Sequence, residues 1–329
     1  CDVMDGVGEP ALIIEGSTSP HSFTLKPSHA KLLEEADIIF WVGESIETFM
    51  ERPLESIVKN AEVVEFMEVE SINKLKFREE SIFEDHDDHD DHDDHDDHDD
   101  HDDHDDHDDH DDHDDHDDHD DHDDHDDHDD HDDHDDHDDH DDHDDHDDHD
   151  DHSGHDHHGH AHGEFDAHIW LDPMNAKEMV HEIAHELGDL DPANKNKYEA
   201  NAQATIQALD QLVNDIEKGI NKDAKFVVFH DAYQYFEERF GVRAAGALTL
   251  NTDVLPGAKQ IADIQDVIND RGIKCIFSEP QFNPKIITTI AEDMNIKTGV
   301  FDPLGANIDS NKDLYFKLIQ NLGNELKGC

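Results

Sequence analysis

Three histidines and one aspartate occupy positions from which they could bind a metal ion. His21 lies in the loop after the apolar run 11–14, and His230 ends the run Val-Val-Phe. His168 directly precedes the sequence Ile-Trp-Leu-Asp-Pro, and Asp302 ends another apolar run. In open α/β sheets, ligands bind beyond the carboxyl ends of the strands. Three imidazoles and one carboxylate form a borderline-soft ligand set, which suits zinc. This pattern therefore predicts a Zn²⁺ site formed by these four side chains.

A second set of metal-binding side chains lies in a tract that repeats His-Asp-Asp without a break from 86 to 152. No apolar side chain occurs between Asp85 and Ala161, so we expect the tract to be disordered. Each repeat offers one imidazole and two carboxylates, which predicts many weak, acid-sensitive zinc sites. The alternative is a solvated linker whose length drifts by repeat slippage. The expected auxiliary ligands are His86, His89, His92, His149, His152, His155, His157, His158, His160 and His162.

The sequence His181-Glu-Ile-Ala-His185 formally matches the His-Glu-x-x-His motif of zinc metalloproteases. A protease site also needs a third protein ligand and a buried helix beside a cleft. The apolar residues of this segment form one stripe, which leaves both histidines and Glu182 facing solvent. We therefore expect neither a peptidase nor any other enzyme.

Apolar runs alternate with helical patterns on both sides of the tract. This alternation predicts an α/β fold with parallel sheets. We expect strands at 11–14, 37–43, 62–66, 226–229, 242–248, 274–277 and 296–301. We expect helices at 29–36, 44–60 (interrupted near Pro53), 174–187, 194–222, 231–240, 258–270, 284–294 and 312–326. The segment 194–222 suits a strut between two lobes, because its 29 residues would span roughly 43 Å as a helix.

The composition of the chain restricts the kinds of molecule that it can bind. The chain has 329 residues and a formal charge of −68, which disfavours binding to nucleic acid or anionic lipid and favours cations. No run is long and apolar enough to span a membrane. Cys275 and Cys329 form either an extracytoplasmic disulfide or two unrelated thiols. Cys1 is either a lipidation site or the point where a fragment starts.

The motifs together resemble the ZnuA-type zinc-binding proteins of ABC importers. The resemblance rests on Ser-Pro-His21-Ser-Phe, His168-Ile-Trp-Leu-Asp-Pro, Phe-His230-Asp-Ala-Tyr, Ser-Glu279-Pro-Gln-Phe and Phe-Asp302-Pro-Leu-Gly, in this order. It covers nearly all of the chain outside the tract. A His/Asp-rich insertion before the His-Ile-Trp-Leu-Asp-Pro motif is typical of the zinc-binding members.

The resemblance implies two α/β lobes joined by one rigid helix, with zinc bound between them. It assigns His21, His168 and His230 as ligands, with Asp302, a water or a nearby carboxylate in the fourth position. It also raises the expectation of a Cys275–Cys329 disulfide. The implied segments are 1–84 and 164–193 for the first lobe, 85–163 for the insertion, 194–222 for the linking helix and 223–329 for the second lobe.

The implied function is zinc capture in the periplasm, as a monomer, and delivery to a membrane ABC permease. The family begins with a strand and a helix before the region that matches Val3–Gly8, so we expect a truncated N-terminus rather than a lipid anchor at Cys1. Besides the disfavoured zinc protease at His181–His185, two rival functions stay open. One is a manganese- or iron-binding member of the family, although a His at position 230 favours zinc over manganese. The other is a zinc-reservoir or adhesin-like surface protein.

Overall fold

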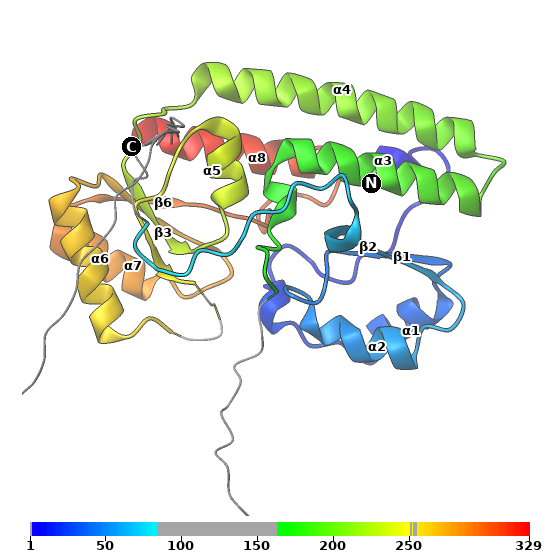
Figure 1. Cartoon of the computed structure of the whole chain (residues 1–329), viewed down its shortest axis with the longest axis horizontal. Helices are drawn as coiled ribbons and strands as arrows, with labels where there is room; N and C mark the ends of the chain where they lie inside the picture. Colours follow the sequence, from blue (N-terminus) through cyan, green and yellow to red (C-terminus); the bar gives the residue numbers. More distant parts are fainter. Residues whose placement is uncertain (1, 84–162, 251, 253–254) are drawn as a thin grey trace, which may run out of the picture. The chain divides into compact units, whose positions relative to one another are not determined.

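The computed structural model describes residues 2–83, 163–250, 252 and 255–329 (Figure 1). The His-Asp-Asp tract and all the auxiliary ligands predicted in it lie outside the described residues. The strands are β1 (Ile38–Trp41), β2 (Glu62–Glu65), β3 (Phe226–His230), β4 (Ala247–Thr249), β5 (Cys275–Ser278) and β6 (Lys297–Val300). The α-helices are α1 (Pro27–Glu35), α2 (Glu51–Ser56), α3 (Pro173–Leu190), α4 (Lys195–Gly219), α5 (Gln234–Phe240), α6 (Ala258–Asp270), α7 (Lys285–Met294) and α8 (Leu314–Glu325). Short 3-10 helices are η1 (Asp2–Met4), η2 (Pro20–Ser22), η3 (Thr48–Met50), η4 (Phe66–Glu68), η5 (Ile169–Leu171) and η6 (Leu326–Gly328). None of these helices combines the length and apolar character that a membrane span requires.

The second lobe is built on a parallel sheet with the strand order β4-β3-β5-β6. Successive side chains of a strand point to opposite faces. Phe226 and Val228 accordingly pack in one core with residues of α5 and α8, while Val227 and Phe229 pack in another with residues of α6 and α7. Because helices cover both faces, β3 is buried along its whole length. This arrangement confirms the predicted parallel α/β fold for this part of the chain.

The first lobe contains the parallel pair β1-β2, which is also covered on both faces. Ile38 and Phe40 pack against residues of η1, α3 and α4, whereas Ile39 and Trp41 pack against residues of α1 and the segment around α2. Helix α3 begins at Pro173, because the side chain of Asp172 accepts a hydrogen bond from Met174 N at 2.8 Å and caps the first turn.

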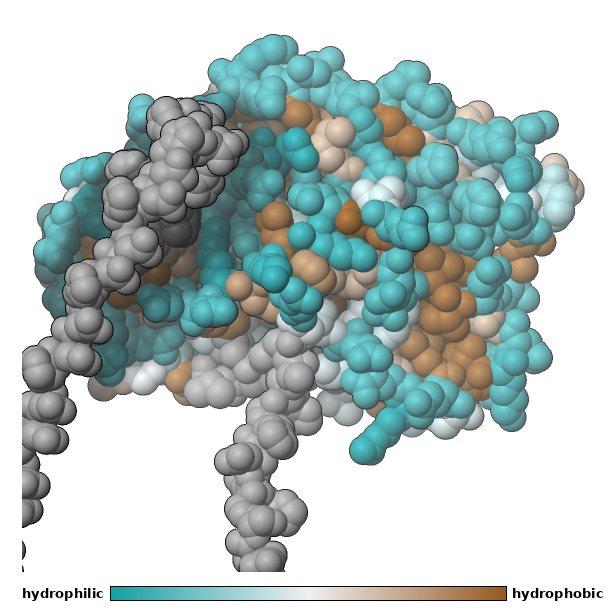
Figure 2. Space-filling view, viewed as in Figure 1, coloured by the Kyte–Doolittle hydropathy of each residue, from teal (hydrophilic) through white to brown (hydrophobic). Residues whose placement is uncertain are grey.

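Helix α4 links the two cores, as the sequence predicts. Tyr198 and Ala202 near its start pack with the first lobe, while Leu209, Leu212 and Ile216 near its end pack with the second. Figure 2 shows a mostly hydrophilic surface where α4 faces outward in this view. The helix therefore buries one stripe along both lobes and exposes the other.

Residues 75–83, here called the connecting segment, leave the first lobe and pair with the edge of the second sheet. Ile82 forms an antiparallel bridge with Gly246, and Ala247 N donates to Ser81 O at 2.8 Å. Arg271 Nη1 donates to Phe83 O at 2.6 Å. The sequence places all of these residues in the first lobe. Leu75 and Phe77 do bond to residues 164–166 of that lobe, whereas Ser81 and Phe83 form backbone hydrogen bonds with the second.

Cys275 and Cys329 form a disulfide, which confirms the bond implied by the resemblance. It ties the end of the chain to the start of β5. The strand predicted at 11–14 is wrong, because these residues form no strand and Leu12 is 59 % exposed. An apolar run forms a strand only where a neighbouring strand can hydrogen-bond with its backbone. Pro53 lies in the first turn of α2, where proline is tolerated, and does not interrupt it.

Candidate metal centre

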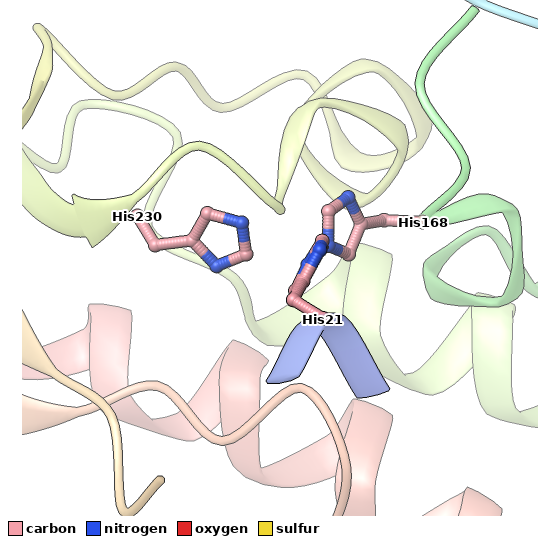
Figure 3. A group of neighbouring side chains, drawn as sticks. All are labelled: His21, His168 and His230. Atoms are coloured by element: carbon pink, nitrogen blue, oxygen red, sulfur yellow. The ribbon is translucent and has the colours of Figure 1, made fainter. Parts of the chain in front are cut away.

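The structure brings His21, His168 and His230 together from three separate segments of the chain. His21 lies on η2, His168 directly precedes η5, and His230 is the last residue of β3. Figure 3 shows the three imidazole rings turned toward one another. Among the described residues they form a group in which one ligand atom from each residue lies within 4.8 Å of the others.

The spacing of these rings suits a small tetrahedral ion. His21 Nε2 and His168 Nε2 lie 3.3 Å apart. Zn–N bonds of about 2.0–2.1 Å at tetrahedral angles would separate two nitrogens by about 3.3–3.4 Å. The ring of His230 lies 5.2 Å from that of His21 and 4.9 Å from that of His168, centroid to centroid. Three neutral imidazoles in this arrangement can bind one transition-metal ion.

The cavity between the rings has a volume of about 10 Å³. That volume accommodates roughly one water molecule. Its lining includes the three histidines, Glu279 and Gln281. A space of this size excludes organic ligands and leaves room for a single ion.

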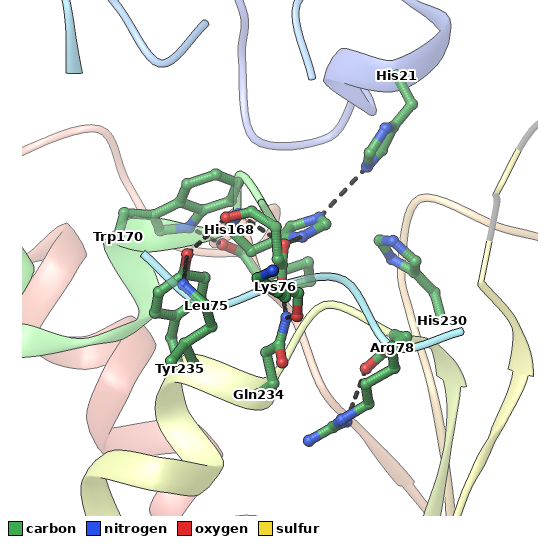
Figure 4. A network of polar contacts seen from close by, with 12 residues as sticks. His21, Leu75, Lys76, Arg78, His168, Trp170, His230, Gln234 and Tyr235 are labelled. Atoms are coloured by element: carbon green, nitrogen blue, oxygen red, sulfur yellow. Dashed lines mark hydrogen bonds and ion pairs between the residues drawn. The ribbon is translucent and has the colours of Figure 1, made fainter. Parts of the chain in front are cut away.

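His168 is held from behind by a buried carboxylate. Its Nδ1 donates to Asp166 Oδ1 at 2.6 Å, and its backbone N–H donates to the same oxygen at 2.9 Å. Gln234 Nε2 donates to Asp166 Oδ2 at 2.6 Å, and Tyr235 Oη donates to Asp166 O at 2.6 Å (Figure 4). A carboxylate can only accept, so the proton stays on Nδ1 and the Nε2 lone pair is available to a metal.

Asp166 is fully buried, which by itself raises its pKa. The charge of His168 and the hydrogen bonds from His168 and Gln234 outweigh burial and hold the pKa of Asp166 below its usual value. The site therefore keeps this group ionised. Sequence reasoning missed Asp166. Its place two residues before His168 was the available signal.

Glu279 lies beside His230 and lines the same cavity. Its Oε1 lies 3.4 Å from His230 Nδ1, and both side chains are buried. The parallel register pairs Phe226 with Cys275, so continuing it by four residues brings His230 opposite Glu279. Burial lowers the pKa of His230, but the negative charge of Glu279 raises it more, so it lies above the ordinary value. Sequence reasoning quoted Glu279 in a motif but gave it no role.

Asp302 lies close to the cavity but is not a member of the histidine cluster. Its Oδ1 accepts from Leu304 N, Gly305 N and Gln281 Nε2, and its Oδ2 accepts from Ala306 N at 2.6 Å. These four donors occupy much of its accepting capacity. Its role as a fourth ligand stays a prediction, and Glu279 is the carboxylate that lines the cavity.

A buried charge cluster lies behind His230. Arg78 of the connecting segment donates to Asp231 at 2.8 Å and to Glu237 at 2.5 Å. Burial raises the pKa of Asp231 to about 7; Arg78 opposes this, and Glu237, which shares the same cation, reinforces it. The connecting segment therefore neutralises charge directly beneath the metal ligand.

The protease motif does not form a metal site in the described residues. His181 and His185 are both exposed on α3. His185 Nδ1 lies 3.0 Å from the carboxylate of Glu186. The prediction that these side chains face solvent is confirmed for the two histidines, while Glu182 is partly buried.

Comparisons with known proteins show the family of the chain. Residues 2–329 match the family described as "ZnuA: Zinc-uptake complex component A periplasmic". The high-affinity zinc uptake system protein ZnuA of Brucella abortus (strain 2308) is 45 % identical over 329 residues, covering 99 % of this chain and 86 % of that protein. The protein of the same name from Haemophilus influenzae is 36 % identical and covers 99 % and 88 %.

Solved structures share the fold. A crystal structure of ZnuA has a TM-score of 0.65 at 18 % identity, covering 98 % of this chain and 92 % of the other. The periplasmic zinc binding protein TroA from Treponema pallidum has a TM-score of 0.67 at 15 % identity, covering 99 % and 92 %. With the family match over nearly its whole length and the 45 % identical relative, the chain belongs to the ZnuA family of periplasmic zinc-uptake components.

Proposed function

We propose that this protein captures Zn²⁺ in the periplasm and delivers it to the membrane permease of an ABC importer. The observation that carries the proposal is the cluster of His21, His168 and His230 around a cavity of about 10 Å³. The named function of the curated relatives, high-affinity zinc uptake, supports the same conclusion. We assign the protein no catalytic step, and we propose that it acts as a monomer without binding nucleic acid.

The donor set favours zinc over the alternative cargoes. Three imidazoles suit a borderline ion such as Zn²⁺, whereas Mg²⁺ and Ca²⁺ prefer shells made only of oxygen. Mn²⁺ would bind more favourably if a carboxylate replaced one imidazole. The clustered ligands are instead three histidines. We therefore keep manganese or iron as the lesser candidate.

The fourth coordination position has three candidates. Asp302 is engaged by four hydrogen-bond donors, and Glu279 faces the Nδ1 of His230. A water completes the tetrahedron without breaking either set of contacts. We propose water in the fourth position, with Asp302 and Glu279 as the alternatives that mutagenesis distinguishes.

The test is a Zn²⁺ titration of the metal-stripped full-length chain in competition with a chelator, which hides the weak sites predicted in the tract. The parent is compared with the triple variant His21→Ala, His168→Ala, His230→Ala. The matched control replaces the exposed His181 and His185 by Ala. We expect one tight equivalent in the parent and in the control, and none in the triple variant.

If the parent chain bound no tight equivalent of Zn²⁺, the proposed transport function would be refuted, and a zinc reservoir would be the remaining function. A second titration, with residues 86–162 deleted, separates the tract from the cluster. The tight equivalent should survive this deletion, because none of the three clustered histidines lies in the deleted range. A manganese affinity above that for zinc would instead favour the manganese-binding alternative.

A further inference from the structure

The loop at 302–306 of the second lobe, here called the clasp loop, has an unusually dense set of backbone contacts. The carboxylate of Asp302 accepts hydrogen bonds from the backbone N–H groups of Leu304, Gly305 and Ala306. Gly305 has a φ of +74°, a conformation that glycine adopts most readily. One side chain therefore fixes the backbone of the whole loop.

The segment that leads to His21 packs directly on this loop. A Cβ atom added at Gly16 would lie 2.7 Å from Leu304 O and 3.2 Å from Ala306 N. Both neighbours are backbone atoms, which cannot rotate away as a side chain could. Glycine at this position thus permits the backbone of the first segment to touch the backbone of the clasp loop.

Gln281 joins the two backbones. Its Nε2 donates to Gly16 O at 2.9 Å and to Asp302 Oδ1 at 3.0 Å. Both partners are acceptors, so the orientation of the amide follows from the contacts. Its Oε1 is buried and has no hydrogen-bond partner among the described residues, and the residue lines the metal cavity.

The clasp loop also holds the segment of the second ligand. Trp170 Nε1 donates to Pro303 O at 2.8 Å, and the Trp170 ring lies 5.4 Å from the ring of His168. The segments of His21 and His168 therefore both meet the loop that follows β6. His21 depends on this contact more than His168 does, because its own helix η2 has three residues and the ring is partly exposed.

We propose that Gly16 and Gln281 are positioning residues that hold His21 at coordination distance by fastening its segment to the clasp loop. The inference rests on the proposed zinc site and adds residues that do not themselves bind the ion. A ligand on a short loop binds metal weakly unless other contacts order it beforehand, because binding must then supply that ordering. Outer partners of this kind typically change metal affinity 10- to 100-fold.

Two variants break the clasp by different means in the full-length protein. Gly16→Ala forces apart the two backbones, and Gln281→Met keeps the side-chain length but removes both hydrogen bonds. Gly257→Ala is the control for the first, because nothing lies within 4 Å of an added Cβ there. Gln203→Met, at an exposed position of α4, is the control for the second.

Two measurements are made on every variant. The rate of Zn²⁺ release into excess chelator reports the metal site, and amide hydrogen exchange of the metal-stripped protein over residues 15–23 and 302–308 reports the clasp itself. We expect Gly16→Ala and Gln281→Met each to release zinc at least about tenfold faster and to exchange faster in both segments. The double variant should add little to either single change, because both remove one contact. The thermal unfolding midpoints should stay close to those of the controls.

Unchanged exchange and unchanged zinc release in both variants would overturn the proposal. Faster exchange with unchanged zinc release would also overturn it, since the contact would exist without positioning a ligand. Fully additive effects in the double variant would show two independent local disturbances instead of one clasp. If the parent itself held no tight zinc, the proposed function would fail, and the exchange data would still decide whether the clasp exists.

Discussion

Replacing Asp166 by Asn should weaken zinc binding about 10- to 100-fold, which corresponds to roughly 1.4–2.8 kcal/mol. The carboxylate accepts from His168 Nδ1 at 2.6 Å, from His168 N at 2.9 Å and from Gln234 Nε2 at 2.6 Å. The amide of Asn can replace at most one oxygen acceptor, and its NH₂ group meets a donor on the other side. Even where its oxygen faces His168, a neutral amide accepts more weakly than a carboxylate, so the tautomer of His168 is less firmly fixed.

The same change should also alter the pH dependence of stability. The pKa of Asp166 is lowered in the folded protein, so its ionised form contributes stability that is fully present above the unfolded pKa of about 3.9. That contribution is lost as the pH falls through the lowered folded value. The difference in unfolding free energy between parent and variant should therefore be largest near neutral pH and shrink in strong acid.

Chelator competition measures the zinc affinity, and urea denaturation of the metal-stripped protein measures the stability. Asp172→Asn is the matched control, since Asp172 is equally buried and pairs with Arg239 at 2.6 Å and 2.7 Å, yet contacts none of the three histidines. The control should lose stability and keep its zinc affinity. If Asp166→Asn bound zinc as tightly as the parent, the carboxylate would have only a structural role and the reasoning would be refuted.

Three further predictions concern other parts of the molecule. Replacing Cys275 and Cys329 by Ser opens a bridge across a sequence separation of 54, which should lower the unfolding free energy by about 4 kcal/mol in a denaturation experiment. Zinc affinity, measured by chelator competition, should fall as the pH drops from about 8 to about 5, because nearby carboxylates raise the pKa of His230 and protons compete with the metal. In the metal-free protein the same raised pKa stabilises the fold below about pH 6.5. This stabilisation is lost as the pH rises through the folded pKa. Arg78→Met should destabilise the fold by about 3–5 kcal/mol, since it leaves two buried carboxylates without their cation, whereas Lys76→Met, in an exposed ion pair, should change the denaturation midpoint little.

Much of the second lobe could be predicted because its signals are local. Helix α6 begins and ends where the apolar period predicts, at Ala258 and Asp270, and β3 is a continuous apolar run because both its faces are covered. The segment 11–14 shows the limit of such reasoning. A short apolar run has no intrinsic strand geometry, and whether it becomes a strand depends on a neighbour that the sequence does not reveal.

In the candidate site, too, some residues could be predicted from the sequence and others could not. Residue type was enough to nominate His21, His168 and His230, since a metal ligand must be a particular kind of side chain. Of the three, only His230 lies at the end of a strand, because the strand predicted before His21 does not form and His168 precedes a 3-10 helix. The carboxylates behind them could not be found in that way. Asp166 and Glu279 gain their roles from the ring nitrogens they face, and those contacts exist only after separate segments have folded together.

Asp302 shows why residue type alone leaves a ligand assignment open. A carboxylate at the end of a strand can bind a metal or organise the loop that follows, and the sequence is the same in both cases. The two roles differ in how many donors already reach its oxygens. Three backbone N–H groups of the clasp loop and the amide of Gln281 do so here, and Gln281 also donates to Gly16 O. A metal ion at Asp302 would have to compete with contacts that position His21, so ligation by Asp302 would loosen the segment that carries another ligand.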